Sequence, residues 1–137
     1  MNVLSLCDEH PASVPLSATV ADAVRAMLEL GVGAVAVVDD DNVIAGIFTE
    51  RDVMRKMVLS GRDASATPIG DVMTTAVVMA TADISPADAL AVMVNAHHRH
   101  LPIADENGKL LGMLSIRNLL QAQIDSLVTQ LGTMHNA

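Results

Sequence analysis

Thr49 and Asp52 stand three positions apart, and their side chains could bind an anion and a diol side by side. In "GIFTERD", residues 46–52, an apolar run ends at Thr49, where we expect a helix to begin. The first turn of a helix has backbone N–H groups without intrahelical acceptors, and such groups attract anions. Asp52 falls on the same face, where its carboxylate can accept two hydroxyl hydrogen bonds. Gly46 would let a ligand approach the backbone closely.

The same pattern returns 66 residues later in "GMLSIRN", residues 112–118. The second copy keeps the glycine, the hydroxyl residue and the arginine, and it has an amide in place of the acid. Its residues are Gly112, Ser115, Arg117, which matches Arg51, and Asn118, which matches Asp52. An amide accepts hydrogen bonds without the charge that strengthens those of a carboxylate. The sequence therefore predicts that the first site binds more tightly than the second.

A structural explanation of the same residues stays open. T-x-x-D and S-x-x-N are also the pattern of a capping box, in which the third residue of the helix closes the helix start. On this interpretation Thr49 and Asp52 stabilise a helix and bind nothing.

Basic residues gather around the repeated pattern although the chain has a net charge of −8. Five of its eight Lys and Arg residues lie in or beside these segments: Arg51, Arg55, Lys56, Arg99 and Arg117. In "NAHHRHLPI", residues 95–103, we expect Arg99 and His100 to contact phosphate. A solvated cluster at a helix C-terminus is an alternative. We expect no metal site at these histidines, because neighbours on one turn rarely converge on an ion.

The elements that must position these residues are also repeated. Thr19 and Ser85, the latter followed by Pro86, are expected to cap helices whose apolar residues recur at helical spacing. A strand pair around a polar turn and a second helix follow in each copy. We expect strands at 34–38, 43–48, 76–79, 101–104 and 109–114, and second helices at 50–60 and 116–131.

These elements predict an α+β fold with two βαββα repeats. We place the first repeat with the N-terminal segment in residues 1–63, a linker in 64–75, and the second repeat with a C-terminal helix in 76–137. A unit of about 60 residues buries only a modest core. The two copies should therefore pack sheet against sheet as an intramolecular pseudo-dimer.

From about Val14 to Ala122 the chain resembles the paired cystathionine β-synthase (CBS) domain, or Bateman module, of the stand-alone bacterial type. The resemblance implies that Thr49 contacts phosphate and that Asp52 holds the ribose of an adenosyl ligand. AMP is the first choice, with ADP, ATP, NAD or S-adenosylmethionine as alternatives. The resemblance also implies a regulatory protein that senses energy or redox state. On binding its ligand, such a protein changes its conformation or the activity of a regulated partner, which the sequence does not name. A dimeric interaction or scaffold protein with unoccupied clefts is the second hypothesis.

The composition argues against several other classes. A pI near 4.8 and 1% aromatic residues argue against nucleic acid as a partner. The longest apolar run is far shorter than a membrane span, and we expect a cytoplasmic protein that does not bind membranes. Cys7 is the only cysteine, and no nucleophile with a base is recognisable, so we expect no catalytic residue and no enzyme activity. Apolar residues on the second helices predict a homodimer.

Overall fold

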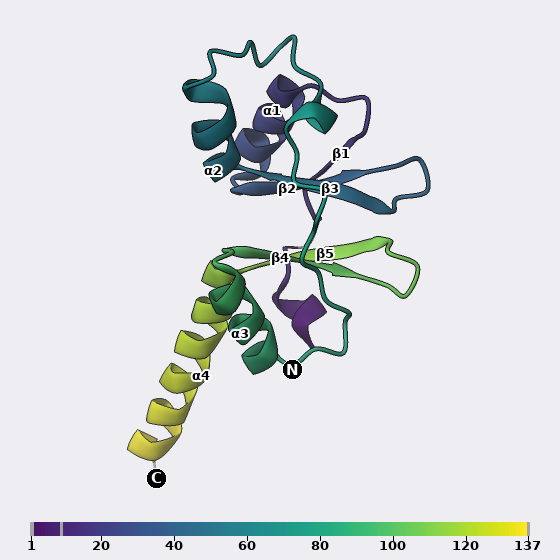
Figure 1. Cartoon of the computed structure of the whole chain (residues 1–137). Helices are drawn as coiled ribbons and strands as arrows, with labels where there is room; N and C mark the ends of the chain where they lie inside the picture. Colours follow the sequence, from purple (N-terminus) through teal and green to yellow (C-terminus); the bar gives the residue numbers. More distant parts are fainter. Residues whose placement is uncertain (1, 9, 137) are drawn as a thin grey trace.

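The computed structural model describes residues 2–8 and 10–136, with side chains up to residue 132. It has two halves, each a small sheet with helices on its outer side, and the two sheets face each other across the middle (Figure 1). The first half contains β1 (Ser13–Pro15), α1 (Val20–Leu30), β2 (Ala34–Val38), β3 (Ile44–Thr49) and α2 (Glu50–Asp52). The second half contains α3 (Pro86–Ala96), β4 (His100–Ala104), β5 (Leu110–Ser115) and α4 (Ile116–Asn136).

The sheet pairing follows the predicted strand pairs. β2 is antiparallel to β3, β4 is antiparallel to β5, and β1 adds to β2 in parallel. Val43 and Lys109 form a bridge between the polar turns of the two halves. Ala36 packs with Leu110 and Met113 between the sheets. The predicted α+β fold and the intramolecular pseudo-dimer are confirmed.

Local capping explains where the first helix of each half begins and ends. Thr19 accepts from the Asp22 N–H while Asp22 accepts from the Thr19 N–H, a full capping box. Ser85 caps α3, with Pro86 at its first position. Gly31 ends α1 in the left-handed conformation at φ +66°, and His97 ends α3 at φ +58°.

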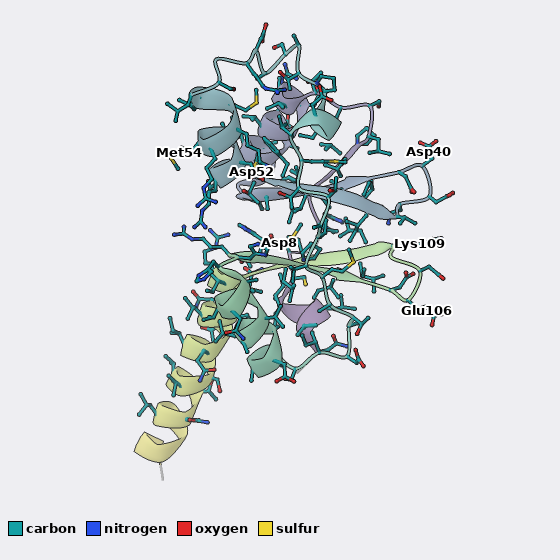
Figure 2. All side chains as sticks on the ribbon, in the orientation of Figure 1. Asp8, Asp40, Asp52, Met54, Glu106 and Lys109 are labelled. Carbon is teal, nitrogen blue, oxygen red and sulfur yellow. The ribbon has the colours of Figure 1, made fainter. Side chains whose placement is uncertain are left out.

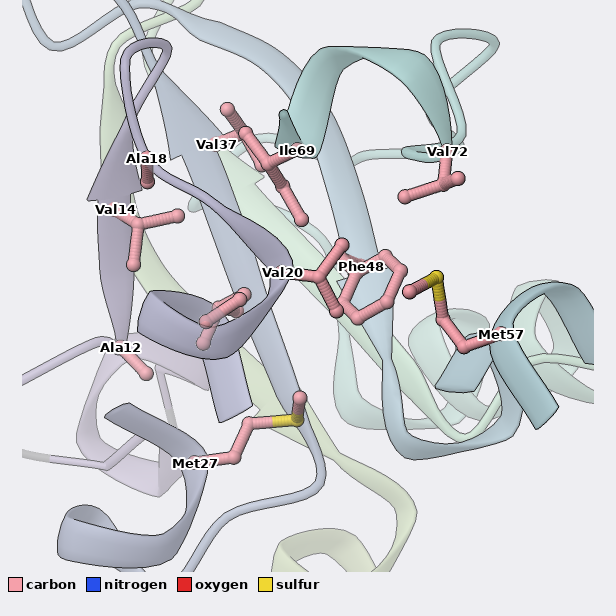
Figure 3. Close-up of a cluster of buried hydrophobic side chains, with 12 residues drawn as sticks. Ala12, Val14, Ala18, Val20, Met27, Val37, Phe48, Met57, Ile69 and Val72 are labelled. Atoms are coloured by element: carbon pink, nitrogen blue, oxygen red, sulfur yellow. The ribbon is translucent and has the colours of Figure 1, made fainter. Parts of the chain in front are cut away.

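Each half has an apolar core of its own between its sheet and its helices. Val20 and Met27 of α1 pack on Val37 and Phe48 of the first sheet (Figure 3). In the second half Met93 of α3 packs with residues of β4 and β5, namely Leu101, Ile103 and Leu114.

Two short helical turns are exchanged between the halves. The 3-10 turn η1 (Val3–Leu6) precedes the first repeat in sequence, yet Val3 is fully buried in the core of the second half. The 3-10 turn η3 (Ile69–Asp71) lies in the predicted linker, and Ile69 is buried in the core of the first half. Each repeat therefore receives part of its core from the segment that precedes the other repeat in the sequence.

Three predicted elements differ from the structure. Residues 76–79 form no strand, because only Ala80 pairs, as a parallel bridge to Ile103. The helix expected at 50–60 is α2 followed by a π-helical segment η2 (Val53–Val58), and left-handed Gly61 follows it. α4 continues to Asn136, five residues beyond the expected end, because Gly132 adopts helical backbone instead of ending the helix. Among the described residues, no helix is both long and apolar enough to cross a bilayer.

Candidate functional site

A cleft of about 780 Å³, named here the first cleft, opens between the two halves. Its walls come from four parts of the chain: Gly33 before β2, residues 47–55 from the end of β3 into η2, residues 74–78, and residues 96–100 where α3 leads into β4. Figure 2 shows nitrogen-bearing side chains gathered between the halves, at the side where Asp52 lies. The first cleft is therefore an interface of both repeats.

Charged side chains of both signs line the first cleft. Its cations are Arg51 and Arg55 from the first repeat and Arg99 from the second, and His97, His98 and His100 lie beside them. Its acids are Glu50 and Asp52. Apolar residues complete the wall: Ile47, Met54, Ala76, Val77 and Val78. This combination of several cations, a carboxylate and an apolar wall suits a ligand with a phosphate, a sugar and a flat base.

Thr49 and Asp52 form the capping box that the structural interpretation predicts. The Asp52 N–H donates to Thr49 Oγ1 at 3.2 Å, and the Thr49 N–H donates to Asp52 Oδ2 at 3.0 Å. The Glu50 N–H donates to the Gly33 carbonyl at 3.0 Å. These three N–H groups are engaged within the protein, so the expectation that free N–H groups at this helix start would bind an anion is wrong for them.

The capping box alone does not make a site. Thr19 and Asp22 form the same box with nearly the same distances, outside both clefts. Asp52 differs in its place, since it lines the first cleft with its side chain only 15% exposed. Its second oxygen, Oδ1, lies 3.6 Å from Lys56 Nζ.

A second cleft of about 240 Å³ occupies the equivalent position of the other repeat. Its lining residues include Ser115 and Arg117, which match Thr49 and Arg51, together with Gly31, which matches His97. The Asn118 N–H donates to Ser115 Oγ at 3.0 Å. Asn118 itself does not line this cleft, and its amide nitrogen is buried without a hydrogen-bond partner among the described residues. The two copies therefore differ in shape as well as in charge.

The two clefts share a wall formed by Gly33, Glu50, Arg99 and His100. A Cβ atom on Gly33 would lie 2.8 Å from Glu50 Oε1 and 3.3 Å from His100 Cε1, so glycine lets these side chains pack there. Burial lowers the pKa of His100, partly opposed by the carboxylates of Glu50 and Asp8 and assisted by the charges of Arg99 and Arg117. His100 is therefore favoured in its neutral form.

The structure brings most of the predicted site residues to the clefts. Thr49, Arg51 and Asp52 line the first cleft, Ser115 and Arg117 line the second, and Arg99 and His100 line both. Gly46 and Gly112 line neither. A Cβ on Gly46 would lie 2.5 Å from Met73 Sδ, and one on Gly112 would lie 2.9 Å from Cys7 Sγ. The close approach that these two glycines allow is to the protein's own chain.

Sequence reasoning missed several lining residues of the first cleft, among them Glu50, Thr74 and Val78, and it assigned His97 no contact with a ligand. A signal for His97 was available, because the repeat offset places it opposite Gly31 at a left-handed helix end. A histidine in that conformation is uncommon and draws attention to the position. No group of three or more potential metal ligands is arranged around a common point within the described residues.

Comparison with known proteins gives the same pair of repeats. The family model described as CBS domain matches residues 3–59 and 69–125. An uncharacterized 17.7 kDa protein of Acidianus ambivalens is 41% identical over 114 residues, which are 83% of this chain and 68% of that protein. The chain spans about half the length of two other curated relatives that it matches, and a smaller share of several more.

Solved structures have the same fold. A protein with CBS domains from Burkholderia ambifaria MC40-6 is 37% identical, with a TM-score of 0.80 over 91% of this chain and 95% of that one. The CBS domain protein PAE2072 from Pyrobaculum aerophilum, solved in complex with AMP, is 24% identical, with a TM-score of 0.82 over 94% of this chain and 99% of that one.

Proposed function

Since the chain belongs to the CBS domain family and is a tandem pair of CBS domains, we propose that it is a regulatory module that binds an adenine nucleotide. The observation that carries the proposal is the first cleft, in which Asp52 from one repeat faces cations from both repeats. AMP is the preferred ligand, and ADP, ATP, NAD and S-adenosylmethionine are the alternatives. The AMP complex of PAE2072 supports this class of ligand for the fold.

We propose a place for each part of the nucleotide from the chemistry of the wall. Arg51, Arg55 and Arg99 supply fixed positive charge for the phosphate, because guanidinium groups pair with phosphate oxygens through two hydrogen bonds. Asp52 Oδ1 accepts hydrogen bonds from the ribose hydroxyls. Val77 and Val78 offer an apolar surface to the base. Base identity is then read mainly by shape.

The regulatory role follows from the position of the cleft between the halves. A ligand that contacts both repeats favours the arrangement in which both sets of contacts are made, and this shifts the population of conformations. We propose that a partner protein reads this shift, that the module performs no catalytic step, and that it acts in the cytoplasm.

Exposed apolar residues favour a second role as a dimeric scaffold. Five apolar residues of α4 are about half exposed or more: Leu120, Ile124, Leu127, Val128 and Leu131. In and just after η2 of the first repeat, three more are exposed: Met54, Val58 and Leu59. Exposed apolar surface of this extent usually marks an interface. We propose a homodimer through these helices, with or without nucleotide in the clefts.

A ligand screen by thermal unfolding tests the nucleotide proposal. A ligand that binds only the folded chain at a hundredfold excess over its Kd raises the free energy of unfolding by about 2.7 kcal/mol. AMP, ADP, ATP, NAD, S-adenosylmethionine and GTP are compared with adenosine, at low and high salt. We expect stabilisation by AMP, less by adenosine, and a smaller effect at high salt because ions screen the cations of the cleft. No stabilisation by any of these compounds would favour the scaffold.

A further inference from the structure

We propose that Lys56, which does not line the first cleft, is a positioning residue for the nucleotide site. It holds in place both Asp52 and the segment from Val72 to Thr74, which contributes Thr74 to the wall of the cleft. The inference rests on the proposed function, because it concerns the affinity of that cleft. It adds a residue outside the repeated pattern to the binding machinery.

Lys56 connects two walls of the cleft. Its ammonium group donates to the carbonyl oxygen of Val72 at 2.6 Å and lies 3.5 Å from Thr74 Oγ1. The same group forms an ion pair with Asp52 Oδ1 at 3.6 Å. Asp52 and Thr74 both line the cleft, and both lie within 3.6 Å of this ammonium group. One cation therefore fixes a side chain and a backbone segment that a ligand would touch together.

The two oxygens of Asp52 have different partners. Oδ2 accepts from the Thr49 N–H at 3.0 Å and belongs to the capping box. Oδ1 faces Lys56 at 3.6 Å, a distance too long for a strong hydrogen bond. Oδ1 therefore keeps lone pairs for hydroxyl donors, while the ammonium charge stabilises the ionised carboxylate that accepts them. Both partners are partly buried, at 36% and 15% side-chain exposure, so the solvent screens the pair less than a surface pair.

The segment that Lys56 binds is itself part of the wall. Thr74 exchanges two backbone hydrogen bonds with Ile47, at 3.0 and 2.9 Å, and Ile47 also lines the cleft. Met73, the residue before Thr74, packs against Gly46, which lies next to Ile47 in β3. By binding the carbonyl of Val72, Lys56 adds a polar anchor where this segment leaves η3.

The second repeat provides an internal comparison. The repeat offset of 66 residues places Asn118 opposite Asp52 and Ala122 opposite Lys56. Both charges of the pair are absent from that copy, and among the residues that the structure describes Asn118 neither lines the second cleft nor has a partner for its amide nitrogen. Acid and lysine are thus present together in one repeat and absent together in the other, as expected for residues that act as a pair.

Titration calorimetry with AMP on the full chain tests the inference. We expect Lys56→Met to weaken AMP binding roughly three- to tenfold, the effect of losing a charge-assisted contact. Lys109→Met is the matched control, since it removes the same charge from an exposed turn far from Asp52 (Figure 2) and should leave the affinity unchanged. Lys56→Arg should keep most of the affinity. In an Asp52→Asn background, Lys56→Met should cost less than in the unmodified chain, because only the contacts with Val72 and Thr74 remain to be lost.

The outcomes separate this inference from the function on which it rests. If the unmodified chain does not bind AMP, the nucleotide proposal and this inference both fail. If it binds AMP and Lys56→Met binds as tightly as Lys109→Met, only the inference is overturned. An equal loss from Lys56→Met with and without the Asp52 carboxylate would also overturn it. If circular dichroism shows Lys56→Met unfolded, Lys56→Gln replaces it, with the same expected loss and the same contrary result.

Discussion

Arg51 Nη1 lies 3.4 Å from the carbonyl oxygen of His97, and this contact joins the first repeat to the C-terminal end of α3 in the second. His97 holds its position in the left-handed conformation at φ +58°, where the equivalent residue of the first repeat is Gly31 at φ +66°. A residue with a Cβ atom is strained in this region, while glycine is not. The second repeat thus places an imidazole in the first cleft at some expense of stability.

His97→Gly should therefore raise the free energy of unfolding by about 1 kcal/mol, because it removes left-handed strain at a helix end. Urea unfolding measures this difference. His98→Gly is the control, since His98 is also exposed and has no positive φ, and it should give no gain. Equal gains from both would contradict the strain at His97.

Asp52→Ala should weaken nucleotide binding roughly tenfold or more, because a hydrogen bond to a charged group is worth about 1.5–3 kcal/mol. Asn118→Ala should change this affinity little, since Asn118 does not line a cleft. Asp22→Ala breaks an equivalent capping box elsewhere and controls for lost helix stability. Calorimetric titration with AMP compares the three variants. Equal affinity in Asp52→Ala and Asp22→Ala would leave "GIFTERD" as a helix cap.

Gly46→Ala should destabilise the fold by about 1–3 kcal/mol, the usual range for overpacking, since its Cβ would meet both Met73 and the Thr74 carbonyl. Gly112→Ala should behave similarly against Cys7. Gly70→Ala is the control, with nothing within 4 Å of its added Cβ and no positive φ. Thermal unfolding of the three variants checks the order, and a stability of Gly46→Ala equal to that of Gly70→Ala would be the contrary result.

Stability should fall as the pH drops through the pKa of an unfolded histidine, about 6.5. Burial lowers the pKa of His100 in the folded chain, so over this range the unfolded chain binds a proton that the folded chain does not. The free energy of unfolding therefore rises with pH up to about 6.5 and then levels off. Urea unfolding at about pH 5.5 and about pH 7.5 should show a smaller difference in His100→Gln than in the unmodified chain. An unchanged difference would exclude His100 as its source.

Ile124→Asp should convert the proposed homodimer into a monomer, because it places a charge in the exposed apolar stripe of α4. Ser126→Asp adds the same charge on the opposite side of the helix, 200° around from Ile124, and should leave the dimer intact. Light scattering at micromolar concentration distinguishes the two masses. A monomeric unmodified chain would contradict the dimer proposal.

The repeat, the caps and the strand pairs could be predicted from the sequence because each depends on neighbours in the chain. Thr19, Ser85 and the polar turns act within a few residues, and the structure has them where they were expected. The failed strand at 76–79 shows the limit, since an apolar run becomes a strand only where a partner edge is available, and there only Ala80 finds one.

The sequence could predict which residues lie at the candidate site, but it could not predict the role of each residue there. Thr49 and Asp52 use the same oxygens to cap a helix or to bind a ligand, so no sequence pattern separates the two. Gly46 contacts Met73, and Lys56 contacts Val72. These partners are distant in the sequence and become neighbours only when the chain folds. The difference in volume between the clefts arises in the same way, from packing across the repeats.

The exchange of η1 and η3 sets an order in which the chain can complete its cores during synthesis. The buried residues of the first core lie between Ala12 and Val72, whereas the core that buries Val3 is made of residues from Ala89 to Leu119. At about 5–20 residues per second, the ribosome takes roughly 2–9 s to make the chain from Val72 to Leu119. During that time the first half can complete its core, whereas the core that buries Val3 of η1 is still incomplete.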